Sequence, residues 1–173
     1  MENKEEWIEM DEKKSREFSE SFIRRAERKL EEAKRFLESY LPSYPESISA
    51  SQECMEFSIK AIFLMLLNKY PRKHRVTKSE FQEVMKMINE LSNHIKQELL
   101  QWTIDIEEFP KLYLYSEFWQ NFYTIVKYGD EELGIPAEKL FGKEEANLAL
   151  KHAEKCYELA SKLENYFKYG LKT

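Results

Sequence analysis

The chain has 173 residues, of which 42% are hydrophobic, 14% aromatic and 34% charged, and its formal net charge is −5. This apolar and aromatic content excludes an intrinsically disordered chain, and the acidic balance provides no global positive field for DNA. All four glycines lie at or after Gly129, and neither Gly-x-Gly-x-x-Gly nor Gly-x4-Gly-Lys is present, which argues against dinucleotide-binding and P-loop enzymes.

The same features predict where the chain resides and how it is divided. The longest apolar run, residues 59–67, is much shorter than the roughly 20 residues that span a bilayer, and the N-terminus lacks the apolar core of a signal peptide. We therefore expect a cytoplasmic protein that does not associate with membranes. Residues 1–14 are mostly charged and are expected to fray, and residues 15–170 are expected to form a single domain.

Two helices are predicted in the first part of the chain. Residues 15–41 carry one apolar stripe with helical spacing, which consists of Phe18, Phe22, Ala26, Leu30, Ala33 and Leu37. The second helix is expected over residues 46–68, and its second half is apolar on nearly all sides. A helix of this kind has to be surrounded, so we expect it at the centre of a bundle.

Three further helices are expected. Thr77 and Glu80 form a capping box that begins a helix of about seven turns, which ends near Trp102. The aromatic-rich residues 112–127 predict a shorter helix, with a strand over residues 112–115 as the local alternative. Residues 129–142 read as a loop, and the alanine-rich residues 143–169 predict the last helix. The predicted fold class is all-α, an up-and-down bundle of four or five helices with no further strand.

Cysteines and histidines give little sign of catalysis or metal binding. Cys54 and Cys156 both fall on apolar stripes, so we expect packed thiols, with a disulfide between them as the alternative. His74, His94 and His152 are isolated from one another and from both cysteines, and no Glu-x-x-His pair is present. No metal site and no cofactor are therefore expected.

A basic segment and an aromatic segment each have two interpretations. Residues 69–78 contain five cations, His74 and no acid, and could contact phosphates or form a solvated loop after a helix C-terminus. The aromatic residues between 118 and 128 could stack on bases or pack in the core or a dimer interface. In both cases we expect the second interpretation.

Glu56 and Lys60 are separated by four residues, and Lys60 interrupts the most apolar stretch of the chain. A charge there must be paired or must reach an opening. We expect an ion pair in which the lysine stem is buried. A ligand site is the alternative, so both residues are candidate ligand-binding residues.

Several segments resemble the HEPN domain family. The segment Ser49-Ala-Ser-Gln-Glu-Cys-Met-Glu56-Phe-Ser-Ile-Lys60-Ala-Ile-Phe is similar to the second helix of that family, and Pro71 and His74 follow it as expected there. The segment Lys127-Tyr-Gly-Asp-Glu-Glu-Leu-Gly-Ile-Pro136-Ala-Glu-Lys-Leu-Phe resembles the loop before the alanine-rich last helix of archaeal members. Its polar residues Lys127, Tyr128 and Asp130 are therefore further candidate ligand-binding residues, together with His74.

The resemblance implies a helical bundle that is usually a homodimer. Many members are metal-independent endoribonucleases with an Arg-x4–6-His motif, often paired with a nucleotidyltransferase antitoxin, and others are inactive modules that bind RNA, nucleotides or partner proteins. Here no arginine stands at that spacing before any histidine. Lys69 has the spacing to His74 but lacks the planar fork that clamps a phosphate.

We therefore expect a non-catalytic, homodimeric module that binds RNA, a nucleotide or a partner such as a nucleotidyltransferase. The first alternative is a toxin-like endoribonuclease in which His74 moves protons and Arg72 or Arg75 holds the phosphate. The second alternative is a purely structural scaffold.

Overall fold

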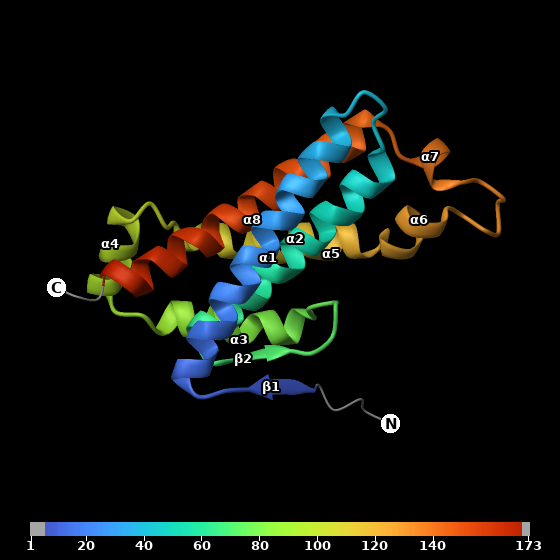
Figure 1. Cartoon of the computed structure of the whole chain (residues 1–173). Helices are drawn as coiled ribbons and strands as arrows, with labels where there is room; N and C mark the ends of the chain where they lie inside the picture. Colours follow the sequence, from blue (N-terminus) through green and yellow to red (C-terminus); the bar gives the residue numbers. More distant parts are fainter. Residues whose placement is uncertain (1–5, 171–173) are drawn as a thin grey trace.

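The computed structural model describes residues 6–170, and this part of the chain is mostly helical. Figure 1 shows the elements in space. In chain order they are β1 (Trp7–Glu9), α1 (Glu12–Glu38), α2 (Tyr44–Leu67), β2 (Lys69–Pro71), α3 (Lys78–Glu90), α4 (Asn93–Gln101), the 3-10 helix η1 (Ile106–Glu108), α5 (Phe109–Gln120), α6 (Tyr123–Tyr128), α7 (Ala137–Leu140) and α8 (Lys143–Tyr169). The predicted all-α helical bundle is confirmed.

Three long helices, α1, α2 and α8, lie side by side along the longest direction of the molecule (Figure 1). α2 runs antiparallel to α1, and α3, α5, α6 and α7 also contact it. Most of its apolar second half is enclosed: Ile59, Ile62 and Phe63 have no exposed surface, and residues 65–67 at its end are half-buried. The prediction that this helix is the central one is confirmed, because a helix that is apolar all round is covered on every side.

α1 buries most of its predicted stripe. Phe22, Ala26, Leu30 and Ala33 are buried against α2 and α8. Phe18, which belongs to the same stripe, is 44% exposed and lies outside the buried core. α1 begins three residues earlier than expected because the Asp11 carboxylate accepts a hydrogen bond from Lys14 N at 2.8 Å and caps the helix.

A two-stranded antiparallel sheet was not expected. β1 pairs with β2, with Ile8 opposite Tyr70. Trp7 lies on the core with its ring centroid 5.7 Å from that of Phe63, and the Lys69 ammonium lies 4.2 Å from the centre of the Trp7 ring. The expectation that residues 7–14 fray was therefore wrong. The position of β1 places the large apolar ring of Trp7 against the core, whereas a frayed segment would leave this ring in water. Residues 1–5 lie outside the described part of the chain.

The predicted long helix over residues 77–102 is broken into α3 and α4. The capping box at Thr77 and Glu80 is present, with Thr77 N donating to Glu80 Oε2 at 2.7 Å. At Leu91 the backbone becomes extended, and the Ser92 hydroxyl then accepts a hydrogen bond from Ile95 N at 3.3 Å and starts α4. The prediction of one continuous helix was wrong, because the Ser92 hydroxyl caps the N-terminus of a second helix.

The predicted fourth helix is also divided. α5 and α6 are separated at Asn121 and Phe122, and residues 112–115 are helical, so the alternative strand is excluded. The following segment is not wholly irregular, because it contains α7 and a backbone bridge between Asp130 and Ile135. Gly129 has φ +75°, and a Cβ there would lie 2.4 Å from Ile135 O, so this turn needs glycine.

α8 has the predicted bounds, and its stripe of small residues packs against α1 and α2. Cys54 on α2 and Cys156 on α8 are buried free thiols, as expected. Among residues 6–170, no helix is both long enough and apolar enough to cross a bilayer.

Candidate functional site

Glu56 lies between two of the other predicted site residues. Lys60 Nζ donates to Glu56 Oε1 at 2.7 Å, and His74 Nδ1 lies 3.2 Å from each oxygen of the same carboxylate. The Lys60 residue is only 5% exposed, whereas the His74 side chain is 74% exposed. The predicted ion pair is confirmed, and the structure brings Glu56, Lys60 and His74 together.

The local sequence explains this meeting. Glu56 and Lys60 share one face of α2 because they are one helical turn apart. Asn68 then ends α2 in the left-handed conformation, at φ 54°, and β2 turns the chain back along the helix. Buried Pro71 and Val76 hold both ends of the loop that carries His74.

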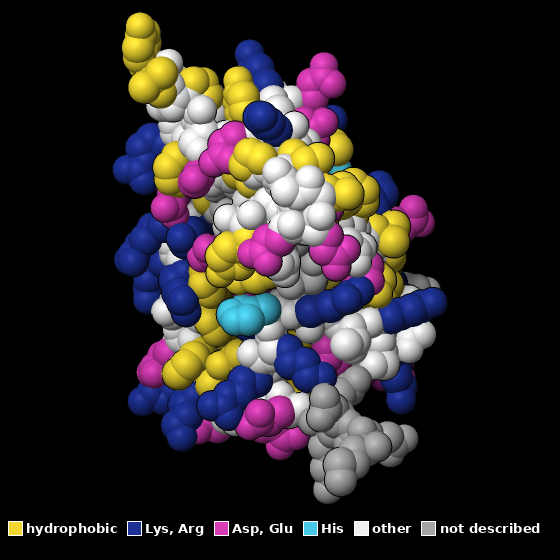
Figure 2. Space-filling model, turned by 90° about the vertical axis from the view of Figure 1, so that its right-hand side faces the viewer, with side chains coloured by type: hydrophobic (Ala, Val, Ile, Leu, Met, Phe, Trp, Pro, Cys, Tyr) yellow, Lys and Arg dark blue, Asp and Glu magenta, His cyan; other side chains and the backbone are white. Residues whose placement is uncertain are grey.

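These residues border a pocket of about 390 Å³ between α1, α2, β2, the following loop and α6. It is lined by Phe22, Arg25, Glu53, Glu56, Phe57, Lys60, Tyr70, Arg72, His74 and Tyr123. Figure 2 shows the face that carries α6 and the loop after it, where basic side chains lie on both sides of a histidine that borders hydrophobic surface. The pocket thus combines aromatic walls with several cations.

The aromatic walls are in mutual contact. The Phe22 and Phe57 rings stack with centroids 5.9 Å apart, and the Tyr70 ring meets Phe22 edge-on at 5.2 Å. On the opposite wall, the His74 and Tyr123 rings are nearly parallel, with an interplanar angle of 20° and centroids 6.4 Å apart. Aromatic faces of this kind can stack on planar ligands.

The charges around the pocket are unequally neutralised. Glu53 forms an ion pair with Lys29 at 3.2 Å, and Arg72 pairs with Glu6 at 2.6 Å. The Arg25 guanidinium instead lies 4.1 Å from the centre of the Phe57 ring and has no ion pair within residues 6–170. Arg25 therefore keeps its hydrogen-bond donors available to a ligand.

The two predicted phosphate-holding arginines lie in different places. Arg72 borders the pocket beside His74. Arg75 points to α5, where it donates to the Glu117 carboxylate, and this hydrogen bond raises the pKa of Arg75. The alternative that uses Arg75 together with His74 is not supported by this placement.

The three candidates near residue 130 are also separated. Lys127 Nζ donates to the hydroxyl of the pocket residue Tyr123 at 2.6 Å, which raises the lysine pKa, but Lys127 itself does not line the pocket. Tyr128 is 67% exposed, and Asp130 Oδ1 accepts from Leu133 N at 2.9 Å within a turn. Neither Tyr128 nor Asp130 lines the pocket.

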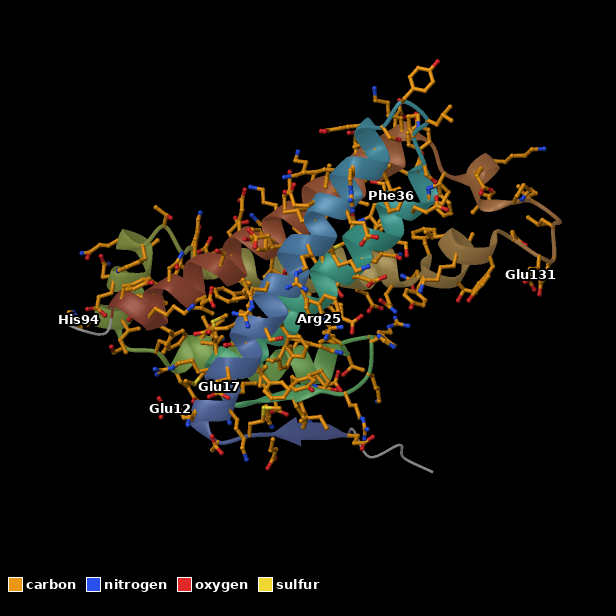
Figure 3. All side chains as sticks on the ribbon, viewed as in Figure 1. Glu12, Glu17, Arg25, Phe36, His94 and Glu131 are labelled. Carbon is orange, nitrogen blue, oxygen red and sulfur yellow. The ribbon has the colours of Figure 1, made fainter. Side chains whose placement is uncertain are left out.

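Arg25 and Phe57 were not predicted as site residues, and Tyr123 was considered only as part of the aromatic segment between residues 118 and 128. Arg25 follows Phe22 by three residues on α1 and so lies at the edge of the apolar stripe. That position was the available signal. Figure 3 labels Arg25 on the middle of α1, on the side of the β2–α3 loop.

The other histidines do not form a second site of this kind. His152 accepts a hydrogen bond at Nδ1 from Trp119 Nε1 at 3.0 Å and stacks on Tyr115 with centroids 4.0 Å apart. His94 lies in α4, at the end of the molecule opposite to α6 and α7 (Figure 3). Within residues 6–170, no three His, Cys, Asp or Glu side chains are grouped so as to hold a metal ion.

A second hollow of about 260 Å³ lies between α1, α2, α3 and α8. One of its cations, Lys168, is held between Glu20 at 3.3 Å and Glu164 at 3.0 Å. The Ser15 hydroxyl beside it is buried without a hydrogen-bond partner in the described chain. This second hollow lacks the combination of a free cation, an imidazole and several aromatic faces that characterises the first pocket.

Comparison with known proteins agrees with this architecture. The HEPN domain model matches residues 19–163. A Methanocaldococcus jannaschii protein named "Putative toxin MJ1304" is 30% identical over 157 residues, which cover 90% of this chain and 93% of that protein. No solved structure matches the chain. The matched residues run from the first turns of α1 to the last turns of α8, and the chain belongs to the HEPN domain family.

Proposed function

We propose that this chain is a non-catalytic HEPN module that binds RNA or a nucleotide in the pocket between α1, α2 and the β2–α3 loop. One observation gives the main support for this proposal. An aromatic pocket in a chain of net charge −5 is lined by Arg25, Lys60, Arg72 and His74. A local group of cations in an acidic protein favours a specific anionic ligand over general attraction to polyanions.

The chemistry of the walls suits a nucleotide. Guanidinium groups bind phosphate oxygens through paired hydrogen bonds, and aromatic rings stack on bases of any sequence. Lys127 adds a cation beside the hydroxyl of Tyr123. A purely structural scaffold gives no reason for these groups to converge on an open pocket.

Fluorescence anisotropy with a labelled single-stranded RNA tests this proposal. Tyr123→Ala and Lys127→Ala should each weaken binding several-fold, because they remove a stacking face and a phosphate contact. Lys139→Ala, which removes an exposed cation on α7, is the matched control and should bind like the unmodified protein. Absence of RNA and nucleotide binding in the unmodified protein would refute the proposal.

The affinity should also fall as salt rises, with a slope that reports the number of phosphate contacts. Three cations of the 69–78 segment are already paired with carboxylates: Lys69 with Glu83, Arg72 with Glu6, and Arg75 with Glu117. We therefore expect the logarithm of the binding constant to fall by only about 1 to 3 for each tenfold rise in salt concentration. Contacts from the whole basic segment would give a steeper fall.

Metal-independent RNA cleavage is the second candidate, and the contact of His74 with Glu56 favours it. If the Glu56 carboxylate accepts a hydrogen bond from His74 Nδ1–H, then Nε2 is left without that contact and can exchange a proton with a substrate. Arg72 lines the same pocket and could stabilise charge on the phosphate. The first proposal is preferred because only one imidazole borders the pocket, and the Lys60 ammonium is engaged by Glu56.

Incubation of the purified protein with RNA in the presence of a metal chelator separates these two functions. Cleavage that disappears in His74→Ala and persists in His94→Ala would establish the nuclease. Intact RNA at high protein concentration, together with measurable binding, would establish the non-catalytic module.

A homodimer and a nucleotidyltransferase partner are further proposals. Leu114 and Phe118 lie one turn apart on α5 and are 61% and 47% exposed, which supports an apolar contact between protomers. The nucleotidyltransferase is proposed from the family resemblance. Native mass spectrometry of the freshly isolated protein would show the stoichiometry and any retained nucleotide or partner together.

A further inference from the structure

We propose that the pocket takes a single nucleotide that carries a free phosphate group, with the phosphomonoester on Arg25 and the base against Tyr123 and His74. This inference rests on the proposed function and narrows its ligand class. The same chemical group is presented by a free nucleoside monophosphate and by the phosphorylated end of an RNA, and the experiment below separates these sources.

Arg25 is positioned for a phosphate before any ligand arrives. Its guanidinium carbon lies 4.1 Å from the Phe57 ring centroid and 5.9 Å from that of Phe22. Contact with the ring faces restricts the planar group and leaves the N–H donors along its edge for hydrogen bonds. A phosphate can accept two of these bonds in parallel.

The neighbouring charges leave Arg25 as the available cation. Both pocket carboxylates are already engaged, Glu53 by Lys29 and Glu56 by Lys60 and His74. Arg25 has no ion pair within the described residues. A phosphomonoester carries about −1.5 to −2 charges near neutral pH, against one for a phosphodiester, so a free phosphate group gains more from this cation.

The His74 and Tyr123 rings provide a place for a base. Aromatic ring faces stack on bases of any sequence, so a base can lie against these two rings. The two ring centroids are 6.4 Å apart, and the rings are within 20° of parallel. The His74 side chain is 74% exposed, so a base can approach this ring from solvent.

The dimensions of the pocket favour one nucleotide. Its volume of about 390 Å³ falls in the lower part of the roughly 300–1,000 Å³ range of small-molecule sites. The face of α2 closes it with buried Lys60 and Phe57. A chain end or a free nucleotide can enter such a pocket, whereas a continuous strand would have to pass over it.

Competition against a labelled RNA, followed by fluorescence anisotropy in chelator, tests the inference. The competitors are one short RNA sequence with a 5′-phosphate, with a 3′-phosphate or with hydroxyls at both ends, and adenosine with or without a 5′-phosphate. We expect at least one phosphorylated form to bind about tenfold more tightly than its hydroxyl counterpart. Preference for the phosphorylated RNA identifies a chain end, and equal competition by the mononucleotide identifies a free nucleotide.

Variants assign this preference to Arg25. Arg25→Gln should abolish the roughly tenfold preference for the phosphorylated form over its hydroxyl counterpart, because the phosphate contact is lost. Arg24→Gln is the matched control, because Arg24 is the adjacent exposed arginine on α1, pairs with Glu20 at 4.0 Å and does not line the pocket. Tyr123→Leu should weaken phosphorylated and hydroxyl-ended ligands alike. Thermal unfolding of each variant confirms that it is folded.

The outcomes distinguish this inference from the function on which it rests. If the unmodified protein binds phosphorylated and hydroxyl-ended RNA equally, the inference is overturned and RNA binding stands. If Arg24→Gln loses the preference as fully as Arg25→Gln does, a diffuse positive field is responsible and the inference is overturned. If no RNA or nucleotide binds, the proposed function fails as well.

Discussion

The carboxylate of Glu56 joins the buried core to the surface, because it holds the Lys60 ammonium at 2.7 Å and lies 3.2 Å from Nδ1 of His74. The side chains of Lys60 and Glu56 are only 7% and 13% exposed. The stability of α2 and the position of the β2–α3 loop therefore depend on the same charged group.

A double-mutant cycle at Glu56 and Lys60 should reveal a strong coupling. Glu56→Gln leaves the Lys60 ammonium buried without its carboxylate, and should lower the free energy of unfolding by about 3 kcal/mol. Lys60→Met combined with Glu56→Gln should recover much of this loss, because no uncompensated charge remains. Urea unfolding measures Glu56→Gln, Lys60→Met and the double variant.

The pair of Arg16 and Glu12, which are 3.5 Å apart and whose side chains are 64% and 84% exposed, is the control for that cycle. Its single substitutions should change the unfolding free energy by less than about 1 kcal/mol. Strictly additive losses at Glu56 and Lys60 would contradict the coupling.

The stability of the fold should fall in mild acid because of His152. Burial lowers the pKa of His152, and the Lys151 cation adds to this effect. Between that lowered pKa and the value near 6.5 of the unfolded chain, the unfolded state binds more protons, so stability rises with pH. The contribution is complete above about pH 6.5 and is lost as the pH falls through the lowered pKa.

Urea unfolding between pH 7.5 and 5 checks this dependence. In His152→Gln the amide oxygen can still accept the Trp119 indole hydrogen but does not titrate, so part of the acid-induced loss should disappear. His94→Gln, which changes a side chain that is 83% exposed, should retain the loss. An identical pH profile for the unmodified protein and His152→Gln would rule out His152 as a source.

Both thiols should be unreactive in the folded protein. Burial raises the pKa of Cys54 to about 12 and that of Cys156 well above its ordinary range, so almost no thiolate forms near pH 8. A chromogenic disulfide reagent should titrate two thiols in urea and almost none in native buffer. Rapid native labelling would show that α2 and α8 separate readily.

Polar substitutions at Leu114 and Phe118 should separate the protomers if α5 forms the dimer contact. Leu114→Ser combined with Phe118→Ser should give the monomer mass by light scattering at micromolar concentration. The thermal stability of the monomer should change little, because neither side chain belongs to the core.

The matched control is Leu133→Ser, which removes an equally exposed leucine, 70% accessible, from the loop before α7. A dimer that persists in the α5 variant would place the contact elsewhere. A monomeric unmodified protein would refute the proposed dimer.

The helical spacing of apolar residues predicted a helix correctly where no local hydrogen bond or turn interrupted it. Alanines at helical spacing predicted α8 with its observed bounds, Lys143–Tyr169. The same periodicity hid the break between α3 and α4, because Leu91, Ile95 and Leu99 keep the spacing across it. The Ser92 cap that makes the break is a local hydrogen bond, and its advantage over a continuous helix depends on the packing around both segments.

The small sheet was missed for a related reason. Trp7 and Tyr70 stand far apart in the sequence, and each strand has only three residues, too few for an alternating pattern. The pairing follows from burial of the Trp7 ring against Phe63, which no local pattern contains.

The pocket residues likewise include some that local spacing predicted and some that only the packing of distant segments brought together. A spacing of four residues on an apolar helix was enough to predict the pairing of Glu56 with Lys60, because helix geometry alone places them on one face. The approach of Arg25, His74 and Tyr123 to that pair was decided by the packing of α1, α6 and the β2–α3 loop around α2. Contacts between distant segments depend on how whole helices pack together, and local spacing carries no information about that arrangement.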